Sequence, residues 1–272
     1  MSGPGVRAVL FDMDGTLYQD FDFHRDYLRY LLEGTPHQHL TEQLIALTDD
    51  ILSREKLPMD RFYRTGLAPD ASSAEALAGW MATRLVDEMP FERCYRQGLG
   101  ELQFLGDPWE VPTFLAGALG VLEEKGEYAF QRVRREMLGK TILPNKPLLD
   151  LLQRLRERYV TVLLSNSPQQ SAADFIDHLG FTGAFTFNLY DAQKPYRLFE
   201  NLRRCPALEG IPTEQLLSVG DHAFNEIVNV HLAGGKTLWM DPYSAAPQVP
   251  CTARVRDLPA LMAWLEENLL DG

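Results

Sequence analysis

Short apolar runs that end in polar or glycine-rich residues recur along this sequence. They cover residues 6–11, 160–164, 184–189, 216–219 and 237–240. Their lengths and boundaries predict buried β-strands. Helical patterns flank the last four runs, over residues 148–158, 168–179, 195–204 and 225–232. This alternation predicts an α/β fold: a parallel sheet with helices on both faces, whose ligands bind beyond the carboxyl ends of the strands.

The stretch between the first and second runs has a different pattern. It shows helical periodicity, with helices expected over residues 23–32, from a capping box at 72–75 to about 89, over 114–125 and over 128–138, the last two ending at Gly126 and Gly139. The sequence therefore predicts an all-helical domain over 18–141, inserted into a core domain made of 1–17 and 142–272. An insertion at this point is placed to act as a lid over a site at the strand ends.

Charge and composition narrow the range of partners. The chain carries 26 Lys and Arg against 38 Asp and Glu, a formal net charge of −12. The electrostatic field of this negative charge repels polyanions, so we expect no nucleic acid and no membrane among the partners. Any anionic substrate must be held by local cations. Three widely spaced cysteines and the absence of a signal peptide or a long apolar run predict a cytoplasmic protein. Its oligomeric state, monomer or homodimer, is left open.

The first apolar run ends in the sequence Asp12-Met13-Asp14-Gly15-Thr16-Leu17. Two carboxylates two residues apart in extended backbone point to the same side, so both would face the crevice beyond the strand. One can attack an electrophile while the other moves protons. A calcium loop is the structural alternative, but it needs glycine at position 6 and glutamate at position 12. Gly15 stands at position 4 and Phe23 at position 12, so a calcium loop does not fit.

Three further polar groups follow later strands. Ser165-Asn166-Ser167-Pro168 opens a helix, where a hydroxyl and free N–H groups can bind an anion, although the same residues also serve as an ordinary helix cap. Lys194 lies 29 positions beyond Ser165; a single lysine is usually a solvated charge. Asp221 ends the fourth run, where its carboxylate can help to bind a hard cation or simply form a turn.

Taken together and in this order, these motifs resemble the haloacid dehalogenase (HAD) superfamily of Asp-dependent phosphohydrolases. The resemblance covers residues 1–17 and 142–272, and the insertion point resembles that of the superfamily's type 1 helical cap. A Rossmann-like core is therefore implied.

The resemblance also implies a role for each matching residue. Asp12 corresponds to the nucleophile that forms an aspartyl-phosphate, and Asp14 to the general acid and base. Lys194 corresponds to the catalytic ammonium that neutralises the nucleophile and the phosphate. Ser165 corresponds to the phosphate-binding hydroxyl, and with it we expect Asn166 and Thr16 to bind substrate.

Magnesium is the implied cofactor. The resemblance assigns Mg²⁺ to the side chain of Asp12, the main-chain carbonyl of Asp14 and the carboxylate of Asp221. An aspartate commonly follows four or five positions after the residue that matches Asp221, but here Asn225 and Glu226 occupy those positions. We expect this pair, Glu226 above all, to support the metal site from behind its direct ligands.

The leading functional hypothesis is a Mg²⁺-dependent phosphomonoester hydrolase for a small phosphorylated metabolite, such as a sugar phosphate or a nucleotide-like compound. Two alternatives stay open: a phosphosugar mutase or other phosphotransferase of the same superfamily, and a non-catalytic binding or regulatory protein on this scaffold. Asp14 disfavours 2-haloacid dehalogenation, because a departing halide needs no proton. Cations and aromatics at 61–64 and 93–109 could line a substrate pocket or pack within the inserted domain.

Overall fold

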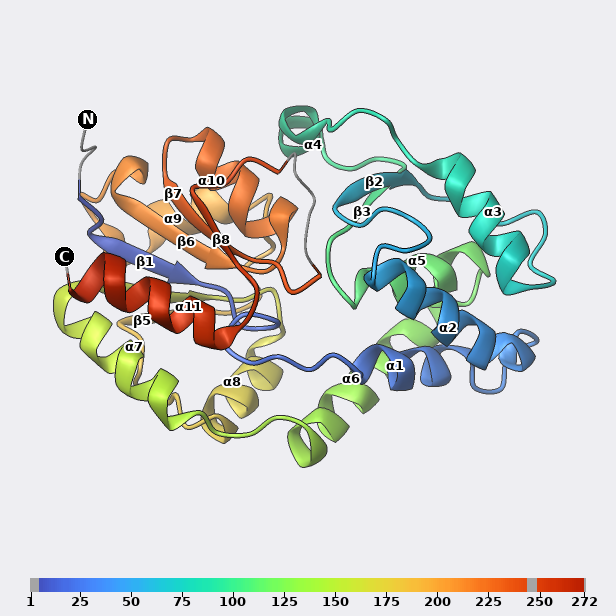
Figure 1. Ribbon diagram of the computed structural model, residues 1–272, viewed down its shortest axis with the longest axis horizontal. Coiled ribbons are helices and arrows are strands. Elements are labelled where there is room, and N and C mark those ends of the chain that lie inside the picture. The colour runs from blue at the N-terminus through green and yellow to red at the C-terminus, as the bar shows by residue number, and fades with distance from the viewer. Residues whose placement is uncertain (1–4, 244–248, 272) are drawn as a thin grey trace. The chain divides into compact units, whose positions relative to one another are not determined.

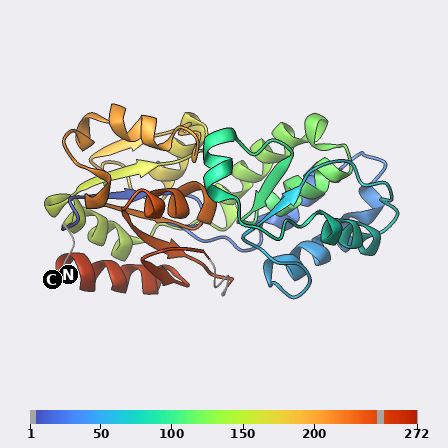
Figure 2. The ribbon, with the colours of Figure 1, turned by 90° about the horizontal axis from the view of Figure 1, so that it is seen from above.

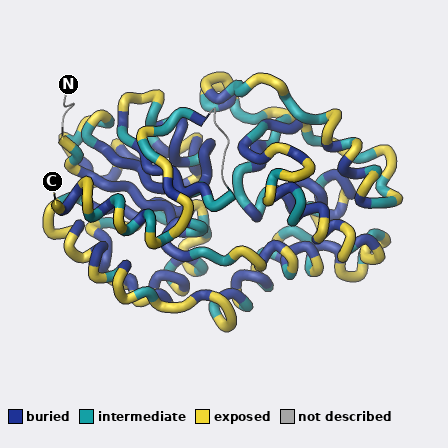
Figure 3. The backbone as a smooth tube through the Cα atoms, viewed as in Figure 1, coloured by how far each residue is buried: buried dark blue, intermediate teal, exposed yellow. Residues whose placement is uncertain are grey.

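The computed structural model describes residues 5–243 and 249–271. The chain divides into two compact units, coloured by position along the chain in Figure 1. The core unit comprises Met1–Gln19 and Thr141–Gly272, and the inserted unit comprises Asp20–Lys140. Each unit has its own buried residues (Figure 3).

A six-stranded parallel sheet forms the centre of the core unit, in the order β5-β4-β1-β6-β7-β8. The strands are β1 (Ala8–Phe11), β4 (Val160–Leu164), β5 (Phe187–Leu189), β6 (Leu216–Gly220), β7 (Lys236–Met240) and β8 (Ala253–Val255). Strand β1 is central, with Ala8 opposite Val160 on one side and Leu216 on the other. The predicted α/β class and parallel sheet are confirmed. Strand β8 was not predicted, because its three residues are too short to give an apolar run.

Helices cover both faces of this sheet, as expected. They are α7 (Lys146–Arg158), α8 (Gln169–His178), α9 (Leu198–Arg204), α10 (Val228–Leu232) and α11 (Leu258–Leu265). Residues of α9 and α10 share one apolar cluster with β1, β4 and β6, while α7 and α11 lie on the opposite face (Figure 2). Helix α7 shows why these segments are helical: the side chain of Asn145 caps its first turn by accepting from the Leu148 N–H. Four of its leucines, Leu148, Leu151, Leu152 and Leu155, recur at helical spacing and are buried.

The inserted unit is mainly helical, but the expectation that it is all-helical is wrong. Its helices are α1 (Phe23–Leu32), α2 (Thr41–Leu52), α3 (Ala74–Arg84), α4 (Phe91–Gln97), α5 (Glu110–Ala118) and α6 (Leu122–Lys140). Strands β2 (Arg61–Arg64) and β3 (Leu102–Leu105) form an antiparallel pair beside them. These strands have four residues each, and neighbouring residues such as Phe62 and Tyr63 are both buried. No period-of-two pattern marks them in the sequence for that reason.

Three predicted helix ends in the inserted unit are also wrong. The break between α5 and α6 falls at Gly120, which has a φ of 72°. Helix α6 runs through both Gly126 and Gly139, where the sequence analysis placed helix ends. The helix cap lies one residue later than the predicted capping box at 72–75 implies, because the Ser73 side chain accepts from the Ala76 N–H, and α3 ends at Arg84 rather than near Met89. A glycine can end a helix or lie within one, and only the backbone angle distinguishes the two.

The aromatic residues at 62 and 63 pack inside the inserted unit. Phe62 and Tyr63 are fully buried, and the Phe62 ring centroid lies 4.9 Å from that of Phe104. All three cysteines are free thiols. Within residues 5–243 and 249–271, no helix has the length and apolar character required to cross a membrane.

Candidate active site

The parallel pairing of β1 with β4 and β6 brings the predicted residues to one edge of the core sheet. Phe11 pairs with Leu163 and with Val219, so β1, β4 and β6 end at the same level. Asp12 continues β1 by donating its N–H to the Val219 carbonyl at 2.9 Å. The polar residues that follow these three strands therefore meet at the carboxyl edge, where open α/β sheets bind their ligands.

Lys194 lies between two buried carboxylates. Its Nζ is 2.6 Å from Asp12 Oδ1 and 2.9 Å from Glu226 Oε1, and its side chain is 1% exposed. Asn166 fixes the backbone that carries this lysine: the Lys194 N–H donates to Asn166 Oδ1 at 2.7 Å, and Asn166 Nδ2 donates to the Lys194 carbonyl at 3.1 Å. The peptide bond from Lys194 to Pro195 is cis. Lys194 is thus a held, desolvated charge rather than a solvated surface lysine.

The electrostatics of this cluster follow from burial and a shortage of positive charge. Burial raises the pKa of Asp12 to about 7; Lys194 opposes this rise, whereas Glu226 and Asp14 add to it. Burial by itself would lower the pKa of the Lys194 ammonium, but the charges and hydrogen bonds of Asp12 and Glu226 outweigh it and raise that pKa above its ordinary value. Lys194 therefore stays protonated and forms ion pairs with both Asp12 and Glu226.

Asp14 is held by two hydroxyl groups. Tyr18 donates to Asp14 Oδ1, and Ser167 Oγ donates to Asp14 Oδ2 at 2.9 Å. Neither contact was predicted from the sequence. Ser167 follows Asp14 by 153 positions, and neither periodicity nor spacing reports a contact over that distance.

Ser165 and Thr16 are both fully buried. Ser165 Oγ accepts from the Ser167 N–H at 3.1 Å, and the main chain of Ser165 bonds to Leu189 and Ala192. Within the described residues, the Thr16 hydroxyl makes no hydrogen bond. Of the three predicted substrate-binding residues, Asn166 bonds to the Lys194 backbone, Ser165 follows the last residue of β4, and Thr16 lies in the turn that follows β1.

Asp221 lies against the turn that follows β1. A methyl group added to Gly15 would be 2.0 Å from Asp221 Oδ2, so only glycine fits there, and the φ of 72° also favours glycine. The indole N–H of Trp239 donates to the Asp221 carbonyl at 2.8 Å. The carboxylate of Asp221 is thereby brought to the segment that contains Asp12 and Asp14.

Glu226 and Asn225 lie in the helical segment Ala223–Ile227, which follows β6. Glu226 accepts from Lys194 through Oε1 and from the His222 N–H through Oε2, at 2.9 Å each. The Asn225 N–H donates to the imidazole Nδ1 of His222 at 3.2 Å. Glu226 thus contacts the lysine directly.

The donor chemistry of the site fits a divalent cation. Among the described residues, no three His, Cys, Asp or Glu side chains form a metal-binding cluster. The predicted set needs only two carboxylates, those of Asp12 and Asp221, together with the main-chain carbonyl of Asp14. Hard oxygen donors of this type suit Mg²⁺. Carboxylates also outnumber the ammonium of Lys194, so a further positive charge would be stabilised here.

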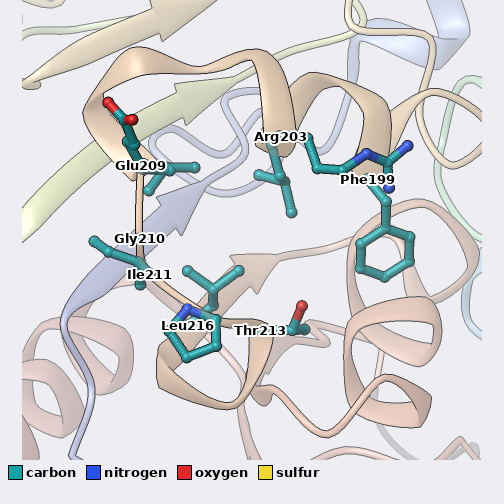
Figure 4. A pocket seen from close by; sticks show the side chains of 10 residues that line it. Phe199, Arg203, Glu209, Gly210, Ile211, Thr213 and Leu216 are labelled. Atoms are coloured by element: carbon teal, nitrogen blue, oxygen red, sulfur yellow. The ribbon is translucent and has the colours of Figure 1, made fainter.

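A cavity of about 740 Å³ lies elsewhere in the core unit. Its lining is mainly apolar and includes Phe199, Leu208 and Leu216 (Figure 4). Leu216 begins β6, whereas Asp221 follows its last residue. The cavity is therefore at the amino edge of the sheet and contains none of the candidate residues.

The fold and the site together define a parallel α/β protein with a carboxylate-lysine site at the carboxyl edge of its sheet. The family model of haloacid dehalogenase-like hydrolases matches residues 6–226, and the chain belongs to this family. No curated protein matches the sequence.

Several solved structures share the fold. YfnB of Bacillus subtilis, crystallised with magnesium, is 19% identical with a TM-score of 0.56, covering 97% of this chain and 100% of its own. An L-2-haloacid dehalogenase is 21% identical with a TM-score of 0.52, at 97% and 100% coverage. A protein of Thermotoga maritima assigned as a β-phosphoglucomutase is 15% identical with a TM-score of 0.53, again at 97% and 100% coverage. At these identities the likeness concerns the fold.

Proposed function

We propose that this protein is a Mg²⁺-dependent phosphomonoester hydrolase that acts on a small phosphorylated metabolite. The observation that carries the proposal is the pairing of two differently held carboxylates: Asp12 against the Lys194 ammonium, and Asp14 between two hydroxyls. A nucleophile beside a cation and a separate proton carrier are the two groups that phosphate ester hydrolysis through a covalent intermediate needs.

The proposed first step is an in-line attack. Asp12 Oδ1 is engaged by Lys194, and Oδ2 makes no hydrogen bond within the described part of the chain, so Oδ2 is the oxygen that attacks phosphorus. The new bond joins Oδ2 to phosphorus as the bond to the ester oxygen breaks, and Asp14 gives its proton to that leaving oxygen. Water then attacks phosphorus while Asp14 takes up a proton, which releases inorganic phosphate and restores the Asp12 carboxylate.

Positive charge is required throughout, because a carboxylate and a phosphate dianion repel each other at close range. Lys194 supplies one charge at Asp12. Asp12, Asp221 and the carbonyl of Asp14 would hold Mg²⁺, which when bound would neutralise charge on the transferring phosphoryl group. The substrate phosphate would lie next to Ser165, whose hydroxyl can donate to it.

Asp14 also favours phosphate esters over alkyl halides as substrates. A halide leaves as a stable anion and needs no proton. Dehalogenation would therefore not require a proton donor that is held by two hydroxyls, as Asp14 is. A phosphotransferase would use the same groups and differ only in the acceptor of the phosphoryl group. Product analysis separates the two: inorganic phosphate indicates hydrolysis, and an isomeric sugar phosphate indicates transfer.

The test is a panel of phosphorylated metabolites assayed for phosphate release with and without Mg²⁺. We expect release from at least one compound, its loss with excess EDTA and its return when Mg²⁺ is restored. Asp12→Asn removes the nucleophilic oxygen without changing shape and should abolish release, whereas Asp150→Asn, on the exposed surface of α7, should not. Release that persists in Asp12→Asn would contradict the proposal.

A further inference from the structure

We propose that Tyr18 and Ser167 are positioning residues that hold Asp14 where it delivers its proton to the leaving oxygen; this inference rests on the proposed function. Each hydroxyl binds a different oxygen of the same carboxylate. With both oxygens engaged, rotation of the Asp14 side chain breaks at least one of these hydrogen bonds. A proton donor must lie within hydrogen-bond reach of the atom that it serves, so a fixed rotamer matters directly for the chemistry.

Tyr18 is itself fixed by packing. It is 5% exposed, and its ring centroid is 5.3 Å from that of Phe175 in α8. The turn that leads to Tyr18 is closed by a bond from the Leu17 N–H to the Met13 carbonyl at 2.9 Å. The phenol hydroxyl therefore approaches Asp14 from a buried ring.

Ser167 is fixed through its main chain. Its N–H donates to Ser165 Oγ at 3.1 Å, and its carbonyl accepts from the Asp191 N–H at 3.1 Å. The hydroxyl of Ser167 thus links Asp14 to the segment of Ser165, the predicted phosphate-binding residue. This link would place the proton carrier in a set position relative to the phosphate.

Hydroxyl groups suit this role better than cations would. A hydroxyl can donate to a carboxylate and can also accept from a carboxylic acid, so the same two partners can hold Asp14 with or without its proton. An ammonium or guanidinium in the same place would only donate and would favour the charged form. The choice of Tyr and Ser is therefore compatible with a residue that gives and takes a proton in each cycle.

The test compares two substrates with leaving groups of different basicity. β-Glycerophosphate releases an alkoxide that needs a proton, whereas p-nitrophenyl phosphate releases a stabilised phenolate. General acid catalysis contributes about 10²–10⁴-fold where it is needed. We expect Tyr18→Phe and Ser167→Ala each to lower kcat/KM, which reports on the first phosphoryl transfer and not on the later attack of water, about tenfold for β-glycerophosphate and less than about threefold for p-nitrophenyl phosphate.

Three controls keep the result specific. Tyr159→Phe removes a phenol hydroxyl that donates to the Leu269 carbonyl and should leave the ratio of the two rates unchanged. Ser167→Thr keeps the hydroxyl and should restore the ratio. Thermal unfolding of each variant verifies the fold. If Tyr18→Phe does not fold, the test relies on Ser167→Ala and Ser167→Thr, because Ser167 is partly exposed and its substitution disturbs the fold less.

The possible results separate the inference from the proposed function. An equal loss on both substrates, or no loss on either, would overturn the positioning role while leaving the hydrolase assignment intact. If the unaltered protein does not hydrolyse β-glycerophosphate, an alkyl phosphate of the metabolite panel that it does hydrolyse takes its place in the comparison. Failure to release phosphate from any compound of the panel would overturn the proposed function, and the inference with it.

Discussion

At the scale of single residues, the buried cluster around Lys194 depends on how two carboxylates share one ammonium. Glu226 is the less expected member, because it stands where the family pattern commonly has aspartate. Its side chain is one methylene longer, and its carboxylate accepts from two donors, Lys194 Nζ and the His222 N–H. Its direct role here is to hold the lysine that holds the nucleophile.

Glu226→Gln tests that role. A carboxylate accepts from both donors, but an amide has a single oxygen, so one donor would face an NH₂ group in a buried site. Leaving a buried donor without an acceptor costs about 1–3 kcal/mol. We expect a loss of that size in the free energy of unfolding, measured by urea denaturation, whereas Glu157→Gln on the exposed face of α7 should change little. Unchanged stability in Glu226→Gln would show that the two hydrogen bonds are dispensable.

His24 in α1 gives a prediction about pH. Its Nε2 lies 2.7 Å from Asp49 Oδ1, and its buried Nδ1 makes no hydrogen bond among the described residues. Burial lowers the pKa of His24 below 6.5, although the hydrogen bond and the charge of Asp49 oppose the shift. Below pH 6.5 the unfolded chain therefore binds a proton at this residue more readily than the folded chain does.

The sign of the effect follows from that difference. The contribution of His24 to stability is complete above pH 6.5 and is lost as the pH falls towards the lowered pKa of the folded state. We expect His24→Gln to be less stable than the unaltered protein at pH 7.5 and to show a smaller fall in unfolding free energy between pH 7.5 and 5.5. A fall of the same size in both proteins would contradict the burial of a neutral imidazole.

The sequence located candidate residues where strands end, because parallel strands place those positions at one edge. Asp12 and Lys194, 182 positions apart, are in direct contact. The contacts of Tyr18 and Ser167 with Asp14 could not be predicted, because they depend on the orientation of side chains after the strands have paired. Strand order and periodicity do not determine those orientations.

At the scale of secondary structure elements, the strand-helix alternation predicted five of the six strands in the core sheet to within three residues. The inserted unit was harder to predict, because its glycines do not mark helix ends uniquely. Gly120 ends α5 with a positive φ, whereas Gly126 and Gly139 lie within α6. All three residues are glycines, and only their backbone angles distinguish the helix end from the helix interior.

Alanine substitutions should therefore have opposite effects in this region. At Gly139 the new methyl group meets nothing within 4 Å in a helical backbone, so Gly139→Ala should stabilise the protein by about 0.5 kcal/mol. Gly120→Ala must adopt a left-handed conformation and contact Leu67 at 3.3 Å, which should destabilise it by about 1–2 kcal/mol. Thermal unfolding of both variants measures this. A gain in stability for Gly120→Ala would mean that the chain does not turn there.

The turn after β1 gives a second prediction with a matched control. Gly15→Ala would place a methyl group on Asp221 Oδ2, whereas Gly34→Ala has a nearly identical φ of 73° and nothing within 4 Å. Both variants bear the same backbone strain. We expect only Gly15→Ala to weaken Mg²⁺ binding, about tenfold or more, because it displaces a carboxylate of the proposed metal site. Isothermal titration calorimetry with Mg²⁺ measures this, and equal affinities in the two variants would contradict the role of Asp221.

At the scale of the whole molecule, the chain contains two units that each bury their own apolar side chains. The inserted unit has 121 residues, from Asp20 to Lys140, and its helices α1 and α6 pack together although they lie at opposite ends of its sequence. A segment of this length can form an independent hydrophobic core. The candidate catalytic residues all belong to the core unit.

Each unit should therefore fold when it is expressed separately. We expect residues 20–140 to give a helical circular dichroism spectrum and a cooperative thermal transition. We expect the same of a core in which a Gly/Ser linker joins Gln19 to Thr141, because its parallel sheet needs no residue of the insertion. The core alone should bind Mg²⁺ if the site consists of Asp12, Asp14 and Asp221, and it should hydrolyse phosphate esters with altered selectivity. A core that stays unfolded would show that the insertion completes its hydrophobic interior, and a folded core without Mg²⁺ affinity would show that the metal site needs residues of the inserted unit.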